Sequence, residues 1–538
     1  MIPEVQHMTP GQGSLSLPFA LTLTAAEWAE KAARCASLLL DATVTPGENG
    51  QIRAVRAPLP AEGYRLTVAD TVTVAYADYQ GLCHGLATLS GLLSVTDGGY
   101  TCPRCTVEDA PVATHRGTML DVARGIQPLE ELLEDMVLLA RARMNVLHLH
   151  LFDSIGCAVA LSCLPEDLLL KEHYTRQDVD AIVAQADVLG LELIPEFDLP
   201  GHSHRMTKVL PALSCPVEEA NTGWVTCVGT EETFRLYDAI IREMDDWFPG
   251  GRYFHVGGDE LHMEDVADGR YLCHWETCPR CRQRMAQEGL RDRQELYYYV
   301  MQRVYQTVTS LGRQMVMWSD QIDCARPCPL PRDILLHFWR VAGQGRGPVE
   351  GCSFAAQAAM GFEMINSHYL EAYIEEEVEL SADTIRDWRW DTRPGCAEEH
   401  RSQVRGGELC VWTYGPNAEP GKDRHDYDYI NRVLPSAVML MGDTLWSGRE
   451  FTYDEAFRQA LTRAILGPRT PVGLDIFAAI GSVVPPKWNA AYAYHDKVTL
   501  TPEAIRQLAQ AVEQMPSSPR TARYAATLHQ IAKERENT

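Results

Sequence analysis

The sequence predicts an α/β protein in which a (β/α)8 TIM barrel follows a small α/β domain and precedes a helical C-terminal region. Three observations predict this class. The chain has 538 residues, which is enough for two or three domains. From residue 115 onward, eight apolar strand-like runs recur over about 330 residues. Amphipathic helical runs lie between most of these strands, as a closed parallel barrel requires.

We place the domain boundaries where the pattern of the sequence changes. Residues 1–110 alternate short β-like and helix-like runs and are predicted to form a non-catalytic α/β domain. Residues 111–450 form the predicted catalytic barrel, and residues 451–538 the helical region. The predicted elements of the first domain are the strands Tyr64–Val68 and Val72–Tyr76 and the helices Ala25–Leu40 and Tyr79–Leu93.

The predicted barrel strands are mostly rich in Val, Ile, Leu and Met, which is typical of parallel strands buried on both faces. Pro128 and Pro435 suit helix starts, because proline lacks the N–H that a first helical turn leaves unpaired. The strands are Arg116–Asp121, Asn145–Leu151, Glu192–Phe197, Tyr253–Val256, Gln314–Trp318, Ile334–Trp339, Glu363–Asn366 and Glu408–Trp412. The helices are Pro128–Arg141, Arg176–Leu189, Glu231–Trp247, Arg291–Gly312 and Pro435–Trp446.

Composition excludes several classes of protein. With 46% hydrophobic and 22% charged residues, the chain has ordinary globular usage. The 48 Lys and Arg stand against 73 Asp and Glu, and a net charge of −25 disfavours nucleic acid as a partner. No apolar run approaches the length of a membrane span. The N-terminus lacks the cationic segment of a secretory signal, and many of the 16 cysteines sit in apolar runs, so we expect a reduced, cytoplasmic protein.

Polar and aromatic side chains follow the predicted strands where each one ends. In this type of barrel, the reactive residues lie at the C-terminal ends of the strands. Carboxylates beside indole rings suit a sugar, whose C–H bonds pack on aromatic faces while its hydroxyls donate to carboxylates. The residues are Arg116 on the first strand, His148, His150, Asp153, Glu196, Asp198, His202, His255, Asp259 and Glu260 on the next three, and Trp318, Trp339, Tyr369 and Trp412 on the later ones.

The pair Asp259-Glu260 is the sharpest feature. Neighbouring residues of a strand point to opposite faces, so both can enter one site only if the backbone leaves the strand there. Gly257-Gly258 permits such a conformation. An Asp-Glu pair in any exposed loop would be unremarkable in itself, but its place directly after a buried strand and two glycines favours a site.

These motifs resemble those of the family 20 glycoside hydrolases, the β-N-acetylhexosaminidases, over about residues 15 to 450. The strongest matches are IPEFDLPGH (194–202) and HVGGDE (255–260). Further matches are RGTMLDVAR (116–124), MNVLHLHLFD (144–153), MWSD (317–320), HFWR (337–340), SHYLEAY (367–373) and GELCVW (407–412). The resemblance implies a retaining, exo-acting enzyme that releases a terminal N-acetylhexosamine from a glycan and needs no metal or cofactor.

The resemblance also implies roles for the residues. The substrate's own 2-acetamido oxygen would attack the anomeric carbon to give an oxazolinium ion, with Glu260 as general acid and then base. Asp259 would orient the acetamido group, and we expect its charge to raise the pKa of Glu260. Asp153 and His202 match a relay to Glu260, and Tyr369 would donate to the acetamido oxygen. Arg116, His150, Trp318, Trp339, Glu371, Trp412 and Tyr414 are the expected substrate-binding residues.

Two departures from the family pattern bear on specificity. Glu371 replaces a frequent Asp or Asn, and Tyr414 stands where many members have a glutamate for the outer hydroxyls. The preference between GlcNAc and GalNAc therefore stays open, as does the natural glycan. The sequence also leaves a homodimer open.

Two rival functions stay open at this stage. His148 and His150, with His202 and His204, could hold a catalytic metal as in an amidohydrolase barrel, although later strands end in Trp and Tyr where such an enzyme would supply further ligands. A catalytically inactive carbohydrate-binding protein would keep the aromatic residues and lose the acid, and here the acid is present.

The tetrapeptide Cys-Pro-Arg-Cys occurs twice, at 102–105 and 278–281. Each pair has zinc-like spacing, so Cys102, Cys105, Cys278 and Cys281 could form a structural zinc site that holds the first domain to the barrel. The simpler interpretation is four reduced cysteines in turn loops.

Overall fold

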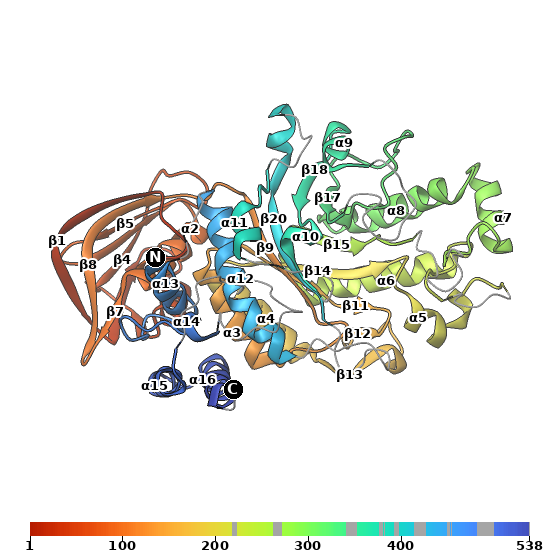
Figure 1. Cartoon of the computed structure of the whole chain (residues 1–538). Coiled ribbons are helices and arrows are strands. Elements are labelled where there is room, and N and C mark those ends of the chain that lie inside the picture. The colour runs from red at the N-terminus through yellow and green to blue at the C-terminus, as the bar shows by residue number, and fades with distance from the viewer. Residues whose placement is uncertain are drawn as a thin grey trace.

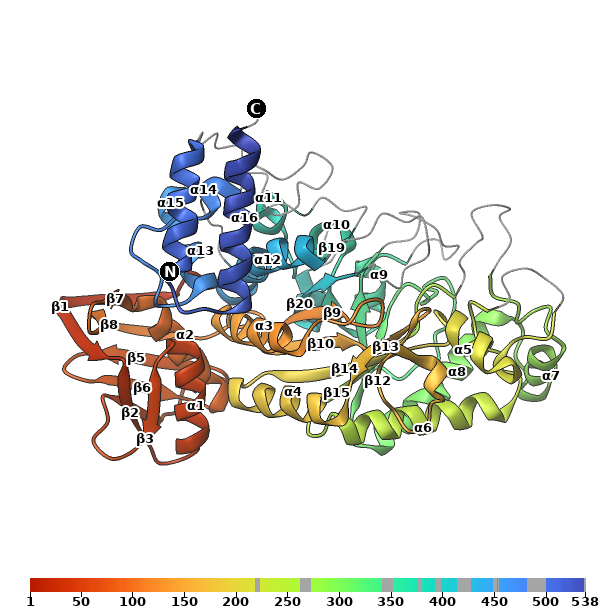
Figure 2. The same cartoon turned by 90° about the horizontal axis from the view of Figure 1, so that it is seen from below.

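The computed structural model of the chain consists of a strand-rich domain at one end, a barrel beside it, and C-terminal helices that lie along both (Figure 1). A view turned by 90° shows the same arrangement (Figure 2). The structure describes residues 1–217, 223–261, 272–340, 352–375, 380, 382–391, 398–413, 427–448, 452, 454–480 and 500–536.

The N-terminal domain is one sheet with two helices packed against it. The strand order is β1-β8-β5-β6-β4-β2-β3, and β7 pairs with β8. The predicted strands β5 and β6 have the predicted bounds, whereas α1 begins four residues later than predicted, because residues up to Ala25 belong to a strand. The elements are β1 (His7–Pro18), β2 (Ala20–Ala25), α1 (Ala29–Leu40), β3 (Thr43–Pro46), β4 (Ile52–Arg56), β5 (Tyr64–Val68), β6 (Val72–Tyr76), α2 (Tyr79–Leu92), β7 (Ser94–Thr96) and β8 (Gly99–Asp109).

The barrel is a closed ring of eight parallel strands, which confirms the predicted fold class. β9 pairs with β10 on one side and with β20 on the other, and β20 also pairs with β18, which closes the ring. The strands are β9 (His115–Asp121), β10 (Val146–His150), β14 (Glu192–Leu199), β15 (Tyr253–Gly257), β16 (Gln314–Trp318), β17 (Leu335–Phe338), β18 (Glu363–Asn366) and β20 (Val404–Val411).

The two ends of helix α4 are marked by residues that favour a helix start and a helix end. The Thr175 side chain accepts from the Asp178 N–H at the start of α4, and Gly190 ends that helix with a φ of 70°, which favours glycine. Pro435 lies inside α12, so its prediction as a helix start was wrong. The main helices are α3 (Leu129–Arg141), α4 (Arg176–Leu189), α6 (Glu231–Trp247), α8 (Arg293–Ser310) and α12 (Tyr427–Ser447).

Shorter elements decorate the barrel between these strands and helices. They include a three-stranded sheet of β11, β12 and β13 that follows β10. The elements are β11 (Phe152–Asp153), β12 (Gly156–Val159), η1 (Glu166–Leu168), β13 (Leu169–Tyr174), α5 (His204–Val209), η2 (Pro211–Leu213), α7 (Pro279–Glu288), α9 (Phe354–Ala359), α10 (Tyr369–Ala372), β19 (Tyr373–Ile374), α11 (Ala382–Asp387) and η3 (Glu398–Gln403).

Among the described residues of the C-terminal region, four helices follow the barrel: α13 (Glu455–Leu466), α14 (Phe477–Ile480), α15 (Pro502–Glu513) and α16 (Pro519–Glu536). α15 and α16 lie side by side in both views (Figures 1 and 2). α16 is anchored to the barrel by Arg520, whose guanidinium lies 2.7 Å from the buried Asp135 carboxylate of α3. None of the described helices is both long and apolar enough to cross a membrane.

The cysteines of the described residues are mostly free and buried, as expected of core packing. One pair differs from the expectation of a fully reduced chain: Cys324 and Cys352 form a disulfide, with their Cα atoms 5.3 Å apart.

Candidate active site

The candidate site lies at the C-terminal ends of the barrel strands, where the sequence placed it. Side chains at or after seven of the strands form one cluster of acids, cations and aromatic rings, and Tyr369, which follows β18, packs with the rings of this cluster. The residues are Arg124 after β9, Asp153 after β10, Asp198 and His202 at and after β14, Asp259 and Glu260 after β15, Trp318 and Asp320 at and after β16, Trp339 and Arg340 after β17, and Trp412 after β20.

The backbone leaves the strand geometry directly after β15, as the two glycines predicted. Gly257 and Gly258 have φ values of 67° and 96°, and Glu260 itself has a φ of 53°. A Cβ atom on Gly257 would overlap the Asp198 carboxylate, so only glycine fits there. As a result, both carboxylates face one ring: Asp259 and Glu260 lie 3.5 and 3.4 Å from Nε2 of His202.

The backbone of Glu260 is held on both sides. Its N–H donates to the Asp320 carboxylate at 3.1 Å, and its carbonyl accepts from the indole N–H of Trp224 at 3.0 Å. Two residues earlier, the Gly258 carbonyl accepts from the Tyr297 hydroxyl at 2.8 Å. The unusual conformation of Glu260 is therefore fixed by contacts to three other parts of the chain.

His202 bridges two acids, as the predicted relay requires. Its Nδ1 lies 3.1 Å from the Asp153 carboxylate, while its Nε2 faces Glu260. The ring is buried and packs against the Trp224 indole, with centroids 4.4 Å apart. Burial lowers the pKa of His202, but Asp153, Asp198 and Asp259 outweigh burial and raise it well above its ordinary value, so the ring is a cation among acids.

The pKa values of the two central carboxyls differ from the expectation. Burial raises the pKa of Asp259, although His202 opposes the shift. Burial also acts to raise the pKa of Glu260, but His202 and the Arg340 guanidinium, 3.6 Å away, lower it more strongly. The expectation of a raised pKa for Glu260 was therefore wrong for this structure, because the cations close to Glu260 outweigh burial, while repulsion from Glu260 contributes to the raised pKa of Asp259.

Arg124 is a site residue that sequence reasoning missed. Its guanidinium lies 2.7 Å from Asp153 and 2.8 Å from Asp121, and 5.1 Å from the centre of the Trp412 ring. The side chain is 15% exposed, so it can still meet a ligand. With His202, it holds the pKa of Asp153 well below its ordinary value in spite of burial.

Aromatic rings pack together in the same cluster, against the arginines of the site. Trp318, Trp339, Tyr369, Tyr373 and Trp412 pack with Met119 and Cys410 in one group. Trp318 is buried and its N–H donates to the Glu196 carboxylate at 2.7 Å, so this hydrogen bond fixes the position of its ring. The indole nitrogens of Trp339 and Trp412 have no hydrogen-bond partner among the described residues, and these two rings are partly exposed.

His150, an expected substrate-binding residue, is fully buried, as is His148. His150 bridges Glu196 at 2.6 Å and Asp153 at 3.1 Å. His148 in turn lies 3.0 Å from Glu408 and 3.2 Å from Glu196. Two atoms 2.6 Å apart share a proton, whereas ligands of one zinc ion at bonds of about 2.0–2.1 Å lie roughly 3.3 Å apart. The 2.6 Å spacing therefore favours a hydrogen bond between His150 and Glu196, and His204, the fourth histidine of the metal alternative, is exposed. The ligand atoms of His148, Glu196 and His255 do lie within 4.8 Å of one another.

Arg116 does not lie at the site, so its predicted role in binding the sugar was wrong. It begins the strand that Arg124 follows, and is fully buried at the opposite end of the barrel. Its guanidinium donates to Glu62 of the N-terminal domain and to the Arg143 carbonyl, and lies 5.1 Å from the Trp446 ring. Beside it, Arg143 and the Trp446 N–H both contact Asp109, at 3.3 and 2.9 Å.

The remaining predicted residues have separate placements. Tyr369 begins α10, its N–H donates to the Trp339 carbonyl at 2.8 Å, and its ring contacts those of Trp339 and Tyr373. Glu371 pairs with His368 at 2.6 Å and its side chain is 29% exposed. Tyr414 lies outside the described residues. The roles of these three residues stay predictions.

The two Cys-Pro-Arg-Cys sequences do not meet. Cys102 and Cys105 lie in β8 of the N-terminal domain, whereas Cys278 and Cys281 lie at the start of α7, at the other end of the molecule (Figures 1 and 2). The predicted four-cysteine set across the domain boundary was therefore wrong. The second pair instead contacts Cys215 and Cys227.

Three of the site residues that we did not predict lie in sequence motifs that could have identified them, and a fourth does not. Asp320 ends the MWSD motif and Arg340 ends HFWR, and both directly follow strand ends. Arg124 ends RGTMLDVAR, three residues beyond its strand. Trp224 had no such signal, because it lies in a long loop with no strand beside it in sequence.

Comparison with protein families gives two matches. Residues 114–448 match the catalytic domain of glycosyl hydrolase family 20, and residues 1–110 match domain 2 of the same family. The first match covers more than half of the chain.

Curated relatives and solved structures agree with this match. A β-hexosaminidase of Vibrio furnissii is 29% identical over 313 residues, which are 52% of this chain and 49% of that protein, so the match spans about half of that relative. A β-hexosaminidase of Akkermansia muciniphila is 29% identical over 442 residues, 75% of this chain and 83% of that protein. The β-N-acetylhexosaminidase structure from Bacteroides fragilis superposes with a TM-score of 0.72 at 21% identity, covering 86% of this chain and 94% of that one, and supports the fold.

Proposed function

The chain belongs to glycosyl hydrolase family 20, and we propose that it is a retaining exo-β-N-acetylhexosaminidase that uses the acetamido group of its substrate as the nucleophile. One observation carries the proposal. Asp259 and Glu260 are adjacent in sequence, yet both face the same buried histidine, which packs on the partly exposed Trp224 ring. Two carboxyls so placed can serve two different atoms of one sugar.

In the first step, the acetamido oxygen attacks the anomeric carbon while the bond to the leaving oxygen breaks. Glu260 gives its proton to that oxygen, and an oxazolinium ion forms. Asp259 accepts the acetamido N–H, which aligns the oxygen and offsets the positive charge that grows on the ring. Because the nucleophile is already attached to the sugar, attack gains from effective molarity.

In the second step, Glu260 takes a proton from a water molecule. The resulting oxygen bonds to the anomeric carbon, and the bond to the acetamido oxygen breaks. Two displacements at one carbon give net retention of configuration. The Trp224 and Asp320 hydrogen bonds to the Glu260 backbone keep its carboxyl in place through both steps.

The polar and aromatic side chains of the site suit the hydroxyls and the C–H bonds of a sugar. Arg124 offers a donor for ring hydroxyls, and Trp412 lies beside it with its N–H unpaired among the described residues. Tyr369 would donate to the acetamido oxygen. Related structures from Vibrio harveyi and Streptomyces plicatus are complexes with N-acetylglucosamine, which supports this sugar class.

The test compares two aryl substrates and one inhibitor. We expect hydrolysis of an aryl N-acetyl-β-glucosaminide, no measurable hydrolysis of the aryl β-glucoside that lacks the acetamido group, and competitive inhibition by a thiazoline mimic of the oxazolinium ion. Asp259→Asn should lose activity while it binds the product. Equal hydrolysis of the two aryl substrates would refute internal attack.

A further inference from the structure

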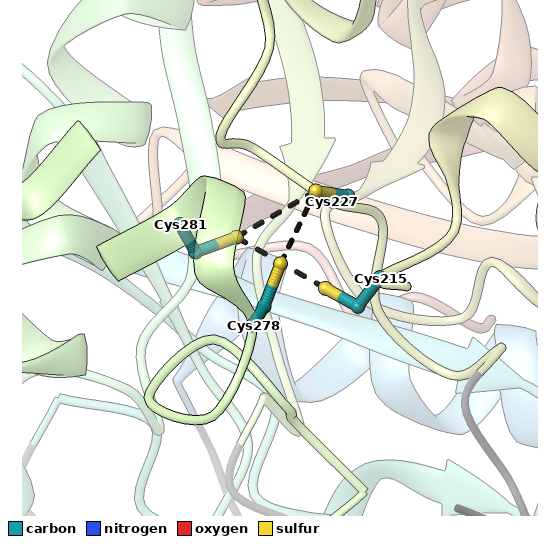
Figure 3. A group of neighbouring side chains, drawn as sticks. All are labelled: Cys215, Cys227, Cys278 and Cys281. Carbon is teal, nitrogen blue, oxygen red and sulfur yellow. Dashed lines mark hydrogen bonds between the residues drawn. The ribbon is translucent and has the colours of Figure 1, made fainter. Parts of the chain in front are cut away.

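Four cysteine side chains converge near the candidate active site. Cys215 follows the turn η2, Cys227 precedes α6, and Cys278 and Cys281 lie at the start of α7. The four side chains point toward one another (Figure 3). All four residues are buried.

The distances between the sulfur atoms fit one bound ion. Cys227 Sγ lies 3.7 Å from the Sγ atoms of both Cys278 and Cys281, and Cys215 Sγ lies 4.0 Å from that of Cys281. All four sulfurs lie within 4.8 Å of one another. A disulfide needs about 2.05 Å. Four sulfurs at Zn–S bonds of about 2.3 Å in a regular tetrahedron lie roughly 3.8 Å apart. We propose that Cys215, Cys227, Cys278 and Cys281 form a closed structural zinc site.

A buried contact between two other cysteines shows how free thiols pack elsewhere in this protein. Cys35 and Cys83 are also buried, with sulfurs 3.6 Å apart, but they meet only as a pair among the described residues. Four sulfurs around one point would leave their thiol groups crowded and poorly hydrogen-bonded. A divalent ion that binds four thiolates removes that crowding, and thiolate ligands select zinc among the common divalent ions.

The backbone prepares this geometry. Cys278 is the N-cap of α7, and Pro279 begins the helix, so Cys281 comes one turn later on the same side. A Cβ atom on Gly229 would overlap the backbone of Arg280 and Cys281, so the Cys227 loop packs directly on this turn. The Cys227 N–H donates to the Leu213 carbonyl at 2.7 Å, and its own carbonyl accepts from Thr233 at 2.6 Å.

The ion would join two loops of the catalytic site. Cys215 and Cys227 lie in the loop after β14, which also carries His202 and Trp224, and Cys278 and Cys281 end the loop after β15, which carries Glu260. A second contact joins the same loops, because the Trp275 N–H donates to the Thr226 carbonyl at 2.8 Å. With four protein ligands and no open position, the zinc would be structural, and the cysteines are positioning residues.

The experiment measures metal in protein purified without chelator and without a metal-affinity step. We expect about one zinc ion per chain by mass spectrometry, and negligible iron. The variant Cys278→Ser with Cys281→Ser should lose the zinc and melt at a lower temperature. The matched control is Cys102→Ser with Cys105→Ser, which alters the other Cys-Pro-Arg-Cys sequence and should keep the zinc.

A second measurement needs no variant. An organomercurial added stepwise to the native protein should release the zinc, detected with a metal-binding dye, as about four thiols are modified. Several outcomes would overturn the proposal: no zinc in the native protein, iron in its place, zinc retained by the Cys278→Ser and Cys281→Ser double variant, or disulfides among the four cysteines.

Discussion

The indole N–H of Trp224 donates to the backbone carbonyl of Glu260 at 3.0 Å. The two residues come from different loops, one after β14 and the other after β15. The same indole packs on His202, the ring that faces the Glu260 carboxyl. Trp224 therefore holds the backbone of Glu260, the proposed acid, by a hydrogen bond. Its ring also packs on His202 and orients that side chain.

Trp224→Phe tests this contact, because it keeps an aromatic ring and removes the donor. We expect kcat to fall about tenfold, the equivalent of roughly 1.4 kcal/mol for one lost hydrogen bond, while KM changes little. Steady-state kinetics measures both constants. Trp247→Phe, on the outer helix α6, serves as the control and should behave as the parent. An unchanged kcat in Trp224→Phe would show that the hydrogen bond does not matter for catalysis.

Glu260→Gln should affect substrates according to their leaving groups. The amide cannot donate an acidic proton, so hydrolysis of a disaccharide should fall by about 10²–10⁴. An aryl glycoside with an acidic phenol needs less protonation and should lose less in its first step. Initial rates on both substrates give the comparison. If both fell by the same factor, proton donation to the leaving oxygen would not be the role of Glu260.

Arg340→Met should change the pH dependence of hydrolysis. In the structure, His202 and Arg340 lower the pKa of Glu260 against the effect of burial. Because Glu260 must be protonated to act as the proposed acid, activity should fall as pH rises through this pKa. Removing the cation raises the pKa, and the limb of the kcat profile should move to higher pH. A shift in the opposite direction would contradict the argument.

Arg124→Met should weaken substrate binding. The variant removes a charged donor near the Asp153 carboxylate and leaves that acid with a higher pKa. We expect kcat/KM to fall by about 10²-fold, since a charged hydrogen bond is worth roughly 1.5–3 kcal/mol and Asp153 is perturbed as well. Circular dichroism and thermal melting check that the fold persists. Parent-like kcat/KM would remove Arg124 from the site.

Arg116→Met should affect stability and leave catalysis alone. The change leaves the partly buried Glu62 without its cation, at the end of the barrel far from the site. We expect the free energy of unfolding to fall by about 3–5 kcal/mol in denaturant titration. The kinetic constants of the folded fraction should match the parent. A selective rise in KM would instead restore the sequence-based role.

Regular features of the fold were predictable from the sequence because local patterns fix them. β16 and β18 have the predicted bounds, since an apolar run between polar residues defines a buried strand on its own. Asp259 and Glu260 were predictable because Gly257 and Gly258 show where the strand ends. The two arginines of RGTMLDVAR were harder to separate. The seven residues of β9 span about 20 Å, so the first arginine lies at one end of the barrel and the second at the other.

Contacts between distant segments account for what the sequence did not predict. The pKa of Glu260 depends on Arg340, which lies 80 residues later and reaches it only because β15 and β17 are close in the ring. The partners of Cys278 and Cys281 come from a loop with no matching motif, so a repeated tetrapeptide favoured the wrong pair. In both cases the fold, rather than the spacing of residues along the sequence, determines which side chains lie next to each other.

Buried ion pairs of Arg116 and Arg143 join the barrel to the first domain. A barrel cut free at residue 111 would keep Arg116 and Arg143 but lose Glu62 and Asp109, their partners in the first domain. The guanidinium groups of Arg116 and Arg143 would then lack these partners and be exposed at the end of the barrel opposite the candidate site, beside the Trp446 ring. We therefore expect that the barrel alone is less stable than the whole protein, because removing one partner of a buried ion pair leaves an uncompensated charge.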